Sequence, residues 1–183
     1  SNKVGKLSSS DSNCKAIFNS GTNNITISSV DTIITGSDNV SKKLSTSIVS
    51  GTTNTQNTVS ESIISGKNNT ITNTNGSAVF GHENSVQDIK YVLISGHGNT
   101  VTNEGECAVG NYNNSKRQNN QQNDTACTLF SVGIGTGPDS NSRNNGIEVR
   151  NTGEVYINYT QIDDNDQIKP LFASCDNLTE ITL

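Results

Sequence analysis

The sequence predicts an all-β fold: a parallel β-roll, or solenoid, of about seven coils of 15 residues, trimeric and followed by a small antiparallel β capping module. The first observation is a short phrase that ends in Gly, two variable residues and Asn, and whose glycines are spaced 15 residues apart five times and then 14. Self-similarity at a fixed short period marks a repeat architecture. The predicted turn ladder consists of Gly21, Gly36, Gly51, Gly66, Gly81, Gly96, Gly110, Asn24, Asn39, Asn54, Asn69, Asn84, Asn99 and Asn113.

The second observation is a pair of adjacent apolar columns, three and two residues before each glycine, in which Asn19 is the one polar member. Neighbouring residues of a strand point to opposite faces. One column therefore fills the inside of the coil, and the other forms an outer apolar stripe of the kind that marks an interface. The residues assigned to the trimer interface or core are Ile33, Ile34, Ile48, Val49, Ile63, Ile64, Val79, Leu93 and Ile94.

Composition limits the alternatives. The hydrophobic fraction is 30%, against about 45–50% for ordinary globular domains, so a large single-chain core is not expected. A net charge of −5 gives no electrostatic case for nucleic acid or an anionic membrane. No apolar run approaches the length of a membrane span. We expect no cofactor, and four free cysteines, because their spacing shows no disulfide or metal framework.

The chain order predicts a flexible, Ser-rich lead-in over residues 1–13, which lacks periodicity. The repeats follow over residues 14–115. In several repeats a second, shorter strand is expected after the Asn, as in Ile25-Thr26-Ile27. Each coil then consists of two short strands and two turns, with Gly supplying positive φ and Asn bonding its own backbone.

The rest of the chain divides into three parts. Residues 116–127 form a polar connecting loop, rich in Asn and Gln. Residues 128–157 alternate as strands do around Asn151-Thr152-Gly153, which is a strong hairpin signal. We expect this block to cap the solenoid and to hold the trimer, since a solenoid end needs protection from open-ended pairing. Residues 158–183, acidic at their start, read as a tail or a truncated stalk.

The repeats resemble the head repeats of YadA-like trimeric autotransporter adhesins, most clearly in Ser62–Thr70 and Ser77–Ser85. Similar repeats occur in fibre proteins of bacteriophage tails, and residues 128–157 resemble the β-rich module that follows such repeats. The resemblance covers residues 14–115. It implies a left-handed β-roll in which three chains pack around a threefold axis.

The resemblance also implies a function: a non-enzymatic, homotrimeric fibre protein, the head of a phage tail fibre or of a bacterial surface adhesin. Its expected partners are further copies of itself and a host cell-surface glycan or protein. Its expected place is extracellular, on a virion tail or a bacterial surface. Free thiols would favour a virion protein assembled in cytoplasm, and disulfides would favour secretion.

One ridge of the coils carries candidate ligand-binding residues. His82 and His97 follow the glycine in consecutive coils, and Lys67 holds this position one coil earlier. A metal site needs three or four convergent ligands. With two histidines in the chain and Glu83 the sole nearby carboxylate, no metal is predicted. The three residues are expected to form a solvated turn ridge, or a stripe that contacts glycans or anions weakly.

No catalytic residues are predicted. Asp31 and Glu61 share a column two coils apart, about 9.6 Å by strand spacing, which approaches the separation in inverting glycosidases. No cleft is marked there. The Gly133–Gly137 stretch resembles a phosphate loop, but no helix is expected after it. The alternative function is a single-chain β-helix polysaccharide lyase or hydrolase, although enzymes of that class usually have larger coils.

Overall fold

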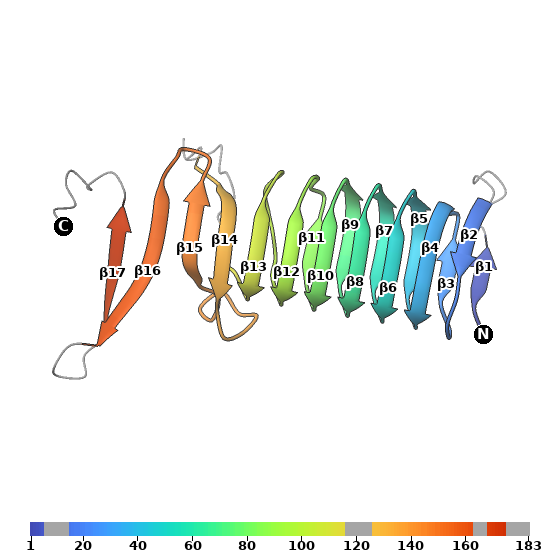
Figure 1. Cartoon of the computed structure of the whole chain (residues 1–183), viewed down its shortest axis with the longest axis horizontal. Coiled ribbons are helices and arrows are strands. Elements are labelled where there is room, and N and C mark those ends of the chain that lie inside the picture. Colours follow the sequence, from blue (N-terminus) through green and yellow to red (C-terminus); the bar gives the residue numbers. More distant parts are fainter. Residues whose placement is uncertain (6–14, 116–125, 163–167, 175–183) are drawn as a thin grey trace, which may run out of the picture.

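The computed structural model describes residues 1–5, 15–115, 126–162 and 168–174. This part of the chain is all β-structure, and it contains no helix. It confirms the predicted class: a parallel β-solenoid of about six turns with a short antiparallel region at its C-terminal end. Figure 1 shows the coils stacked side by side along a rod, with the N-terminus at one end. The left-handed sense of the roll stays a prediction.

The first wall of the solenoid, here called the glycine sheet, contains the repeated glycines. Its strands pair in parallel in the order in which they occur along the chain. They are β2 (Lys15–Asn19), β4 (Val30–Ser37), β6 (Ile48–Thr52), β8 (Ile63–Lys67), β10 (Ala78–His82), β12 (Leu93–His97), β13 (Cys107–Asn111) and β14 (Thr128–Ile134).

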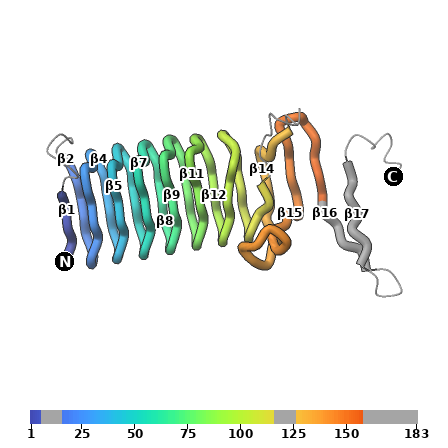
Figure 2. The backbone as a smooth tube through the Cα atoms, turned by 180° about the vertical axis from the view of Figure 1, so that it is seen from behind, coloured from blue at the N-terminus to red at the C-terminus, as the bar shows by residue number. Residues whose placement is uncertain are grey.

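The second wall follows the asparagines and also pairs in parallel. Its strands are β1 (Lys3–Gly5), β3 (Ile25–Ile27), β5 (Val40–Ser45), β7 (Thr55–Ser60), β9 (Thr70–Asn75) and β11 (Ser85–Gln87). Strand β1 corrects part of the expected flexible lead-in, because Lys3–Gly5 pairs with β3 and extends this wall. Residues 6–13 of that segment lie outside the described part of the chain. Figure 2 shows the coils from behind as regular layers as far as β12.

The antiparallel end is built from β14, β15 (Asn145–Arg150), β16 (Val155–Ile162) and β17 (Ile168–Ser174). The predicted hairpin is present, since Val149 and Val155 pair across the turn at Gly153, which has a φ of 88°. Residues expected as a tail or stalk contribute the end of β16 and all of β17. Of the expected connecting loop, residues 116–125 lie outside the described part.

Strand β14 belongs to both architectures. Gly133 pairs with Gly110 in the same parallel register as the earlier glycines, so β14 is a further rung of the solenoid. Its other edge pairs antiparallel with β15. The change of strand direction is visible between β14 and β15 in Figure 1. The solenoid thus continues into the first strand of the block that was expected to cap it and to hold the trimer.

The core is a narrow column inside the coils. From the second repeat on, the residues two before the repeated glycines point inward and have no exposed surface: Ile34, Val49, Ile64, Val79, Ile94 and Ala108. They meet Ile71 and Val86 from the second wall, and Leu44 and Val59 beside them. Near the N-terminal end the second wall is polar, and Ser41 Oγ lies 2.9 Å from the buried amide of Gln56.

The predicted turn ladder is present and hydrogen-bonded throughout. In a typical coil Asn54 Nδ2 donates to the carbonyl oxygens of Ser50 (3.1 Å) and Gly66 (2.9 Å). Its Oδ1 accepts from the backbone N and the side-chain Nδ2 of Asn69 in the next coil. Each ladder asparagine is almost fully buried. The column therefore satisfies backbone groups at a corner that water cannot reach.

The repeated glycines are required by close packing between coils. Gly66 has a φ of 123°, and a Cβ built on it would lie 1.9 Å from the carbonyl oxygen of Gly81. The same approach recurs between successive glycines of this column. Any side chain here would collide with the backbone of the neighbouring coil.

A second corner carries a serine ladder, defined here as Ser47, Ser62 and Ser77, each four residues before a repeated glycine. Ser62 Oγ donates to the carbonyl oxygen of Ser60 (2.7 Å) and accepts from the backbone N of Ser77 (3.2 Å). Ser77 continues the pattern by accepting from the N of Val92. Sequence reasoning missed this column, although its spacing is the same as that of the asparagines.

Candidate functional site

The outer column of the glycine sheet forms an apolar stripe, the feature with most bearing on function. It consists of the residues three before each repeated glycine: Phe18, Ile33, Ile48, Ile63, Ala78, Leu93 and Cys107. Its large members keep much of their surface exposed: 60% for Phe18, 44% for Ile33, 40% for Ile48, 45% for Ile63 and 44% for Leu93. The side chains follow one another from coil to coil in strict parallel register.

The structure divides the residues that were assigned jointly to interface or core. Ile34, Val49, Ile64, Val79 and Ile94 are fully buried and belong to the core. Ile33, Ile48, Ile63 and Leu93 are exposed and belong to the apolar stripe. Alternation along a strand requires such a division. The structure shows which column faces the interior and which faces outward.

Small hydroxyl residues flank the stripe at the position directly before the glycine. Thr35 Oγ1 donates to Ser50 Oγ at 3.1 Å, so this column also links neighbouring coils. Phe80 interrupts it and adds a large, partly exposed ring beside the stripe. The outer face of the sheet is therefore a flat apolar band edged by short side chains, which allow another surface to approach closely.

A corner ridge brings together two of the three candidate ligand residues. The rings of His82 and His97 are stacked, with centroids 4.9 Å apart and planes 9° apart. Glu83 lies between them: its Oε1 is 3.2 Å from His82 Nε2 and its Oε2 is 3.3 Å from His97 Nε2. Lys67 pairs in backbone register with His82 on β8, one coil earlier.

Sequence reasoning missed Tyr112 as a member of this ridge. Its ring tilts against His97 at a centroid distance of 4.7 Å, and its Oη is 3.2 Å from His97 Nε2. The ring covers Gly98, where a Cβ would lie 2.2 Å from it. Tyr112 stands one position further from its glycine than the histidines do, so a search of a single column does not find it.

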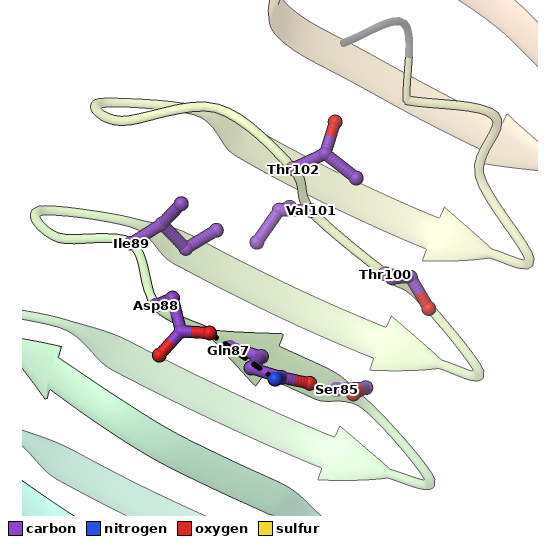
Figure 3. A pocket seen from close by; sticks show the side chains of 7 residues that line it. All are labelled: Ser85, Gln87, Asp88, Ile89, Thr100, Val101 and Thr102. Carbon is purple, nitrogen blue, oxygen red and sulfur yellow. Dashed lines mark hydrogen bonds between the residues drawn. The ribbon is translucent and has the colours of Figure 1, made fainter.

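The last full coil opens a groove, shown in Figure 3, of about 310 Å³. Ile89 and Val101 form its apolar part, and Ser85, Gln87, Asp88, Thr100 and Thr102 complete it. It exists because β11 is joined to the following coil only by a bridge from Ser85 to Thr100. The backbone N of Thr102 turns away and donates instead to Glu106 Oε2 and Ser115 Oγ.

The groove offers little for sugar hydrolysis. Among its lining residues Asp88 is the single carboxylate, and it accepts hydrogen bonds from Asn73 Nδ2 (2.6 Å) and Gln87 Nε2 (3.1 Å). Asp31 and Glu61 lie elsewhere, as exposed corner residues with left-handed φ values of 51° and 49°. In the described part of the chain, Gly133–Gly137 is followed by a turn rather than a helix.

Glu106 is a buried carboxylate that sequence reasoning also missed. It stands four residues before Gly110, where earlier coils have the serine ladder. Its Oε2 accepts from the N of Thr102 and of Asn103 and from Ser115 Oγ, the last at 2.7 Å. Its Oε1 is buried with no hydrogen-bond partner among the described residues. Burial raises the pKa of Glu106, and the hydrogen bonds to Oε2 oppose this only in part.

The two cysteines in the described part of the chain, Cys107 and Cys127, are free thiols. Burial raises the pKa of each, and the nearby charge of Glu106 raises it further. The remaining two cysteines lie outside the described residues. No helix long and apolar enough to cross a membrane occurs in the described ranges.

Comparison of the chain with protein-family models, with curated proteins and with solved structures found no match. The interpretation of the molecule therefore rests on its own geometry: a regular parallel solenoid with an apolar stripe along one face.

Proposed function

We propose that the chain is a non-enzymatic structural and adhesive fibre protein, the homotrimeric head of a phage tail fibre or of a bacterial surface adhesin. The apolar stripe is the observation that carries this proposal. Large apolar side chains recur at one position of consecutive coils and remain 40–60% exposed. Soluble proteins seldom leave a continuous apolar patch uncovered, so a partner surface is required.

Further copies of the same chain fit this stripe best. The coils stack with one constant register, so the stripe of a second copy has the same spacing and its isoleucines fit between those of the first. The small flanking side chains of Ser50 and Ser65 permit close approach. Covering each exposed isoleucine contributes about 1–2 kcal/mol, and this gain recurs in each coil.

The resemblance to YadA-like head repeats supports three copies around a threefold axis, with the stripes directed toward that axis. The outer corners then face solvent, where the ridge of His82 and His97 is available to a host-surface glycan or protein. The free thiols of Cys107 and Cys127 support assembly in a reducing compartment. They favour a virion tail protein over a secreted adhesin.

Sedimentation equilibrium tests the proposal. The wild-type chain is expected to sediment at three times its 19.4 kDa chain mass. Ile63→Asp places a charge on the stripe without disturbing the interior, so this variant should sediment as a monomer that keeps its β-sheet circular dichroism. Ile64→Asp is the matched contrast. The Ile64 side chain, next to Ile63 in the sequence, is fully buried, so this variant should lose the fold itself.

Two results would contradict the proposal. One is a wild-type chain that stays monomeric at concentrations of tens of micromolar. The other is an Ile63→Asp variant that assembles as well as the wild type does, which would place the interface on another face.

A further inference from the structure

We propose that His82, Glu83 and His97 form a binding site for one divalent transition-metal ion, of which Zn²⁺ is the best fit. Their ligand atoms all lie within 4.8 Å of one another. No metal was expected from the sequence, because two histidines and one nearby carboxylate were counted as too few ligands. The structure shows this convergence on the corner ridge of two adjacent coils.

The distances suit tetrahedral coordination. Zn–N bonds of about 2.0–2.1 Å place neighbouring ligand atoms of a tetrahedron about 3.3 Å apart. Each carboxylate oxygen of Glu83 lies near this separation from one imidazole: Oε1 is 3.2 Å from His82 Nε2, and Oε2 is 3.3 Å from His97 Nε2. One ring nitrogen of each histidine and one carboxylate oxygen of Glu83 lie within 4.8 Å of one another, so coordination of one common ion requires rotation of these exposed side chains.

The backbone holds the three ligands in place. His82 on β10 and His97 on β12 are direct partners in the parallel register. Glu83 follows in a left-handed corner, with a φ of 57°, and its N donates to the carbonyl oxygen of Lys67 at 3.0 Å. The N of Gly98 donates to the carbonyl oxygen of His82, and that of Tyr112 to the carbonyl oxygen of His97. Ligand positions fixed in this way lower the ordering cost of binding.

The side chains around the ligands complete the site. The Oη of Tyr112 lies 3.2 Å from His97 Nε2, so a phenol hydroxyl stands at the edge of the site. Arg143 Nη1 donates to the carbonyl oxygens of Gly98 (2.9 Å) and Asn113 (3.2 Å), which fixes the corner that carries the tyrosine. Lys67 is a neighbouring cation on this ridge. The carboxylate of Glu83 carries the negative charge that offsets both Lys67 and the ion.

The ligand set selects the kind of metal. Imidazole nitrogens with a carboxylate suit Zn²⁺, Ni²⁺ and Cu²⁺, whereas Mg²⁺ and Ca²⁺ require mainly oxygen ligands. The side chains of His82, Glu83 and His97 are 38–48% exposed, so the ion can enter without opening the fold. All three ligands come from one chain, and the site therefore does not depend on assembly into a trimer.

The test is a calorimetric titration of the tag-free full chain with Zn²⁺ at neutral pH, with Mg²⁺ titrated in parallel. We expect saturable binding of one Zn²⁺ per chain, no binding of Mg²⁺, and a thermal midpoint that rises with the Zn²⁺ concentration. Binding should weaken at acid pH, because ligation requires the unprotonated imidazole.

Variants assign the binding to these residues. His82→Asn, His97→Asn and Glu83→Gln should each lower the Zn²⁺ affinity at least tenfold. Asparagine suits the strand position, since Asn111 pairs with His97 in the next coil. Glu61→Gln is the matched control, an exposed glutamate in another left-handed corner, and should bind as the wild type does.

All these variants keep the four cysteines, so binding by thiols would survive in every one of them. Equal Zn²⁺ affinity in the double variant His82→Asn/His97→Asn would overturn the proposal. So would a folded wild-type chain that shows no saturable Zn²⁺ binding.

Discussion

The regular coils and the last coil solve the same problem of buried polar groups in different ways. In the regular coils the corner is filled by identical residues, and Asn39, Asn54, Asn69 and Asn84 bond to one another and to the neighbouring backbone in one repeated pattern. In the last coil, which is one residue shorter, Asn113 Nδ2 turns to Ser131 Oγ instead. Identical residues in successive coils thus satisfy one another's polar groups. Where the repeat is broken, each buried polar group needs a different partner.

The same contrast holds at the second corner. Ser47, Ser62 and Ser77 each donate within their own coil and accept from the next. The last coil has Glu106 at this position: its Oε2 accepts several hydrogen bonds, whereas its Oε1 is buried with no partner among the residues that the structure describes. The groove beside Val101 lies between this coil and the preceding one. The irregular coil therefore replaces the repeated corner with a buried carboxylate and an adjacent groove.

The largest effect is expected from breaking the close packing of the regular coils. Gly66→Ala places a Cβ against the carbonyl oxygen of Gly81 and should lower the free energy of unfolding by about 4 kcal/mol or more. Gly153→Ala is the matched control, because Gly153 also has a positive φ but has no heavy atom within 4 Å of a built Cβ. Its cost should be only that of the left-handed backbone, about 1–2 kcal/mol.

Thermal and urea unfolding of the two variants measure this difference. Equal destabilisation would show that backbone conformation alone, and not the contact between coils, requires the repeated glycine. A solenoid in which successive repeated glycines are not in close contact would give that result.

A smaller, pH-dependent effect is expected in the last coil. The pKa of Glu106 is raised in the folded chain, so the folded state holds this proton more tightly than the unfolded state does. Its contribution to stability is then present at pH values below the unfolded pKa and is lost as the pH rises through the folded pKa. Glu106→Gln removes this loss, so the stability of the variant relative to wild type should increase from pH 4 to pH 7.

The change should be on the order of 1 kcal/mol, as for a buried polar group that is incompletely hydrogen-bonded. Urea unfolding at both pH values measures it. Glu104→Gln, an exposed neighbour, is the control and should show no such change. A relative stability of Glu106→Gln that falls with rising pH would mean that the folded chain favours the ionised carboxylate.

The sequence was sufficient to predict the coils, because glycine and asparagine recur at the positions of Gly66 and Asn69. A backbone contact between coils excludes a side chain at the first position, and a buried amide bonds the backbone at the second. It showed that Ile63 and Ile64 face opposite ways, but two isoleucines do not reveal which is inside. Gly133 was not recognised as a further repeat of the glycine column, because it comes 23 positions after Gly110 and not 14 or 15. Glu106 and the contact between Glu83 and the histidines depend on how coils stack, which no single coil encodes.

Copies of the chain are proposed to meet along the apolar stripe, and Cys107 lies within that stripe. Stripes that pack in parallel register bring the Cys107 thiols of neighbouring copies together. A short bis-maleimide should therefore give covalent dimers of the wild-type chain and none of Cys107→Ser, which keeps the other three cysteines. Dimers in equal amount from both proteins, or none from the wild type, would contradict the claim.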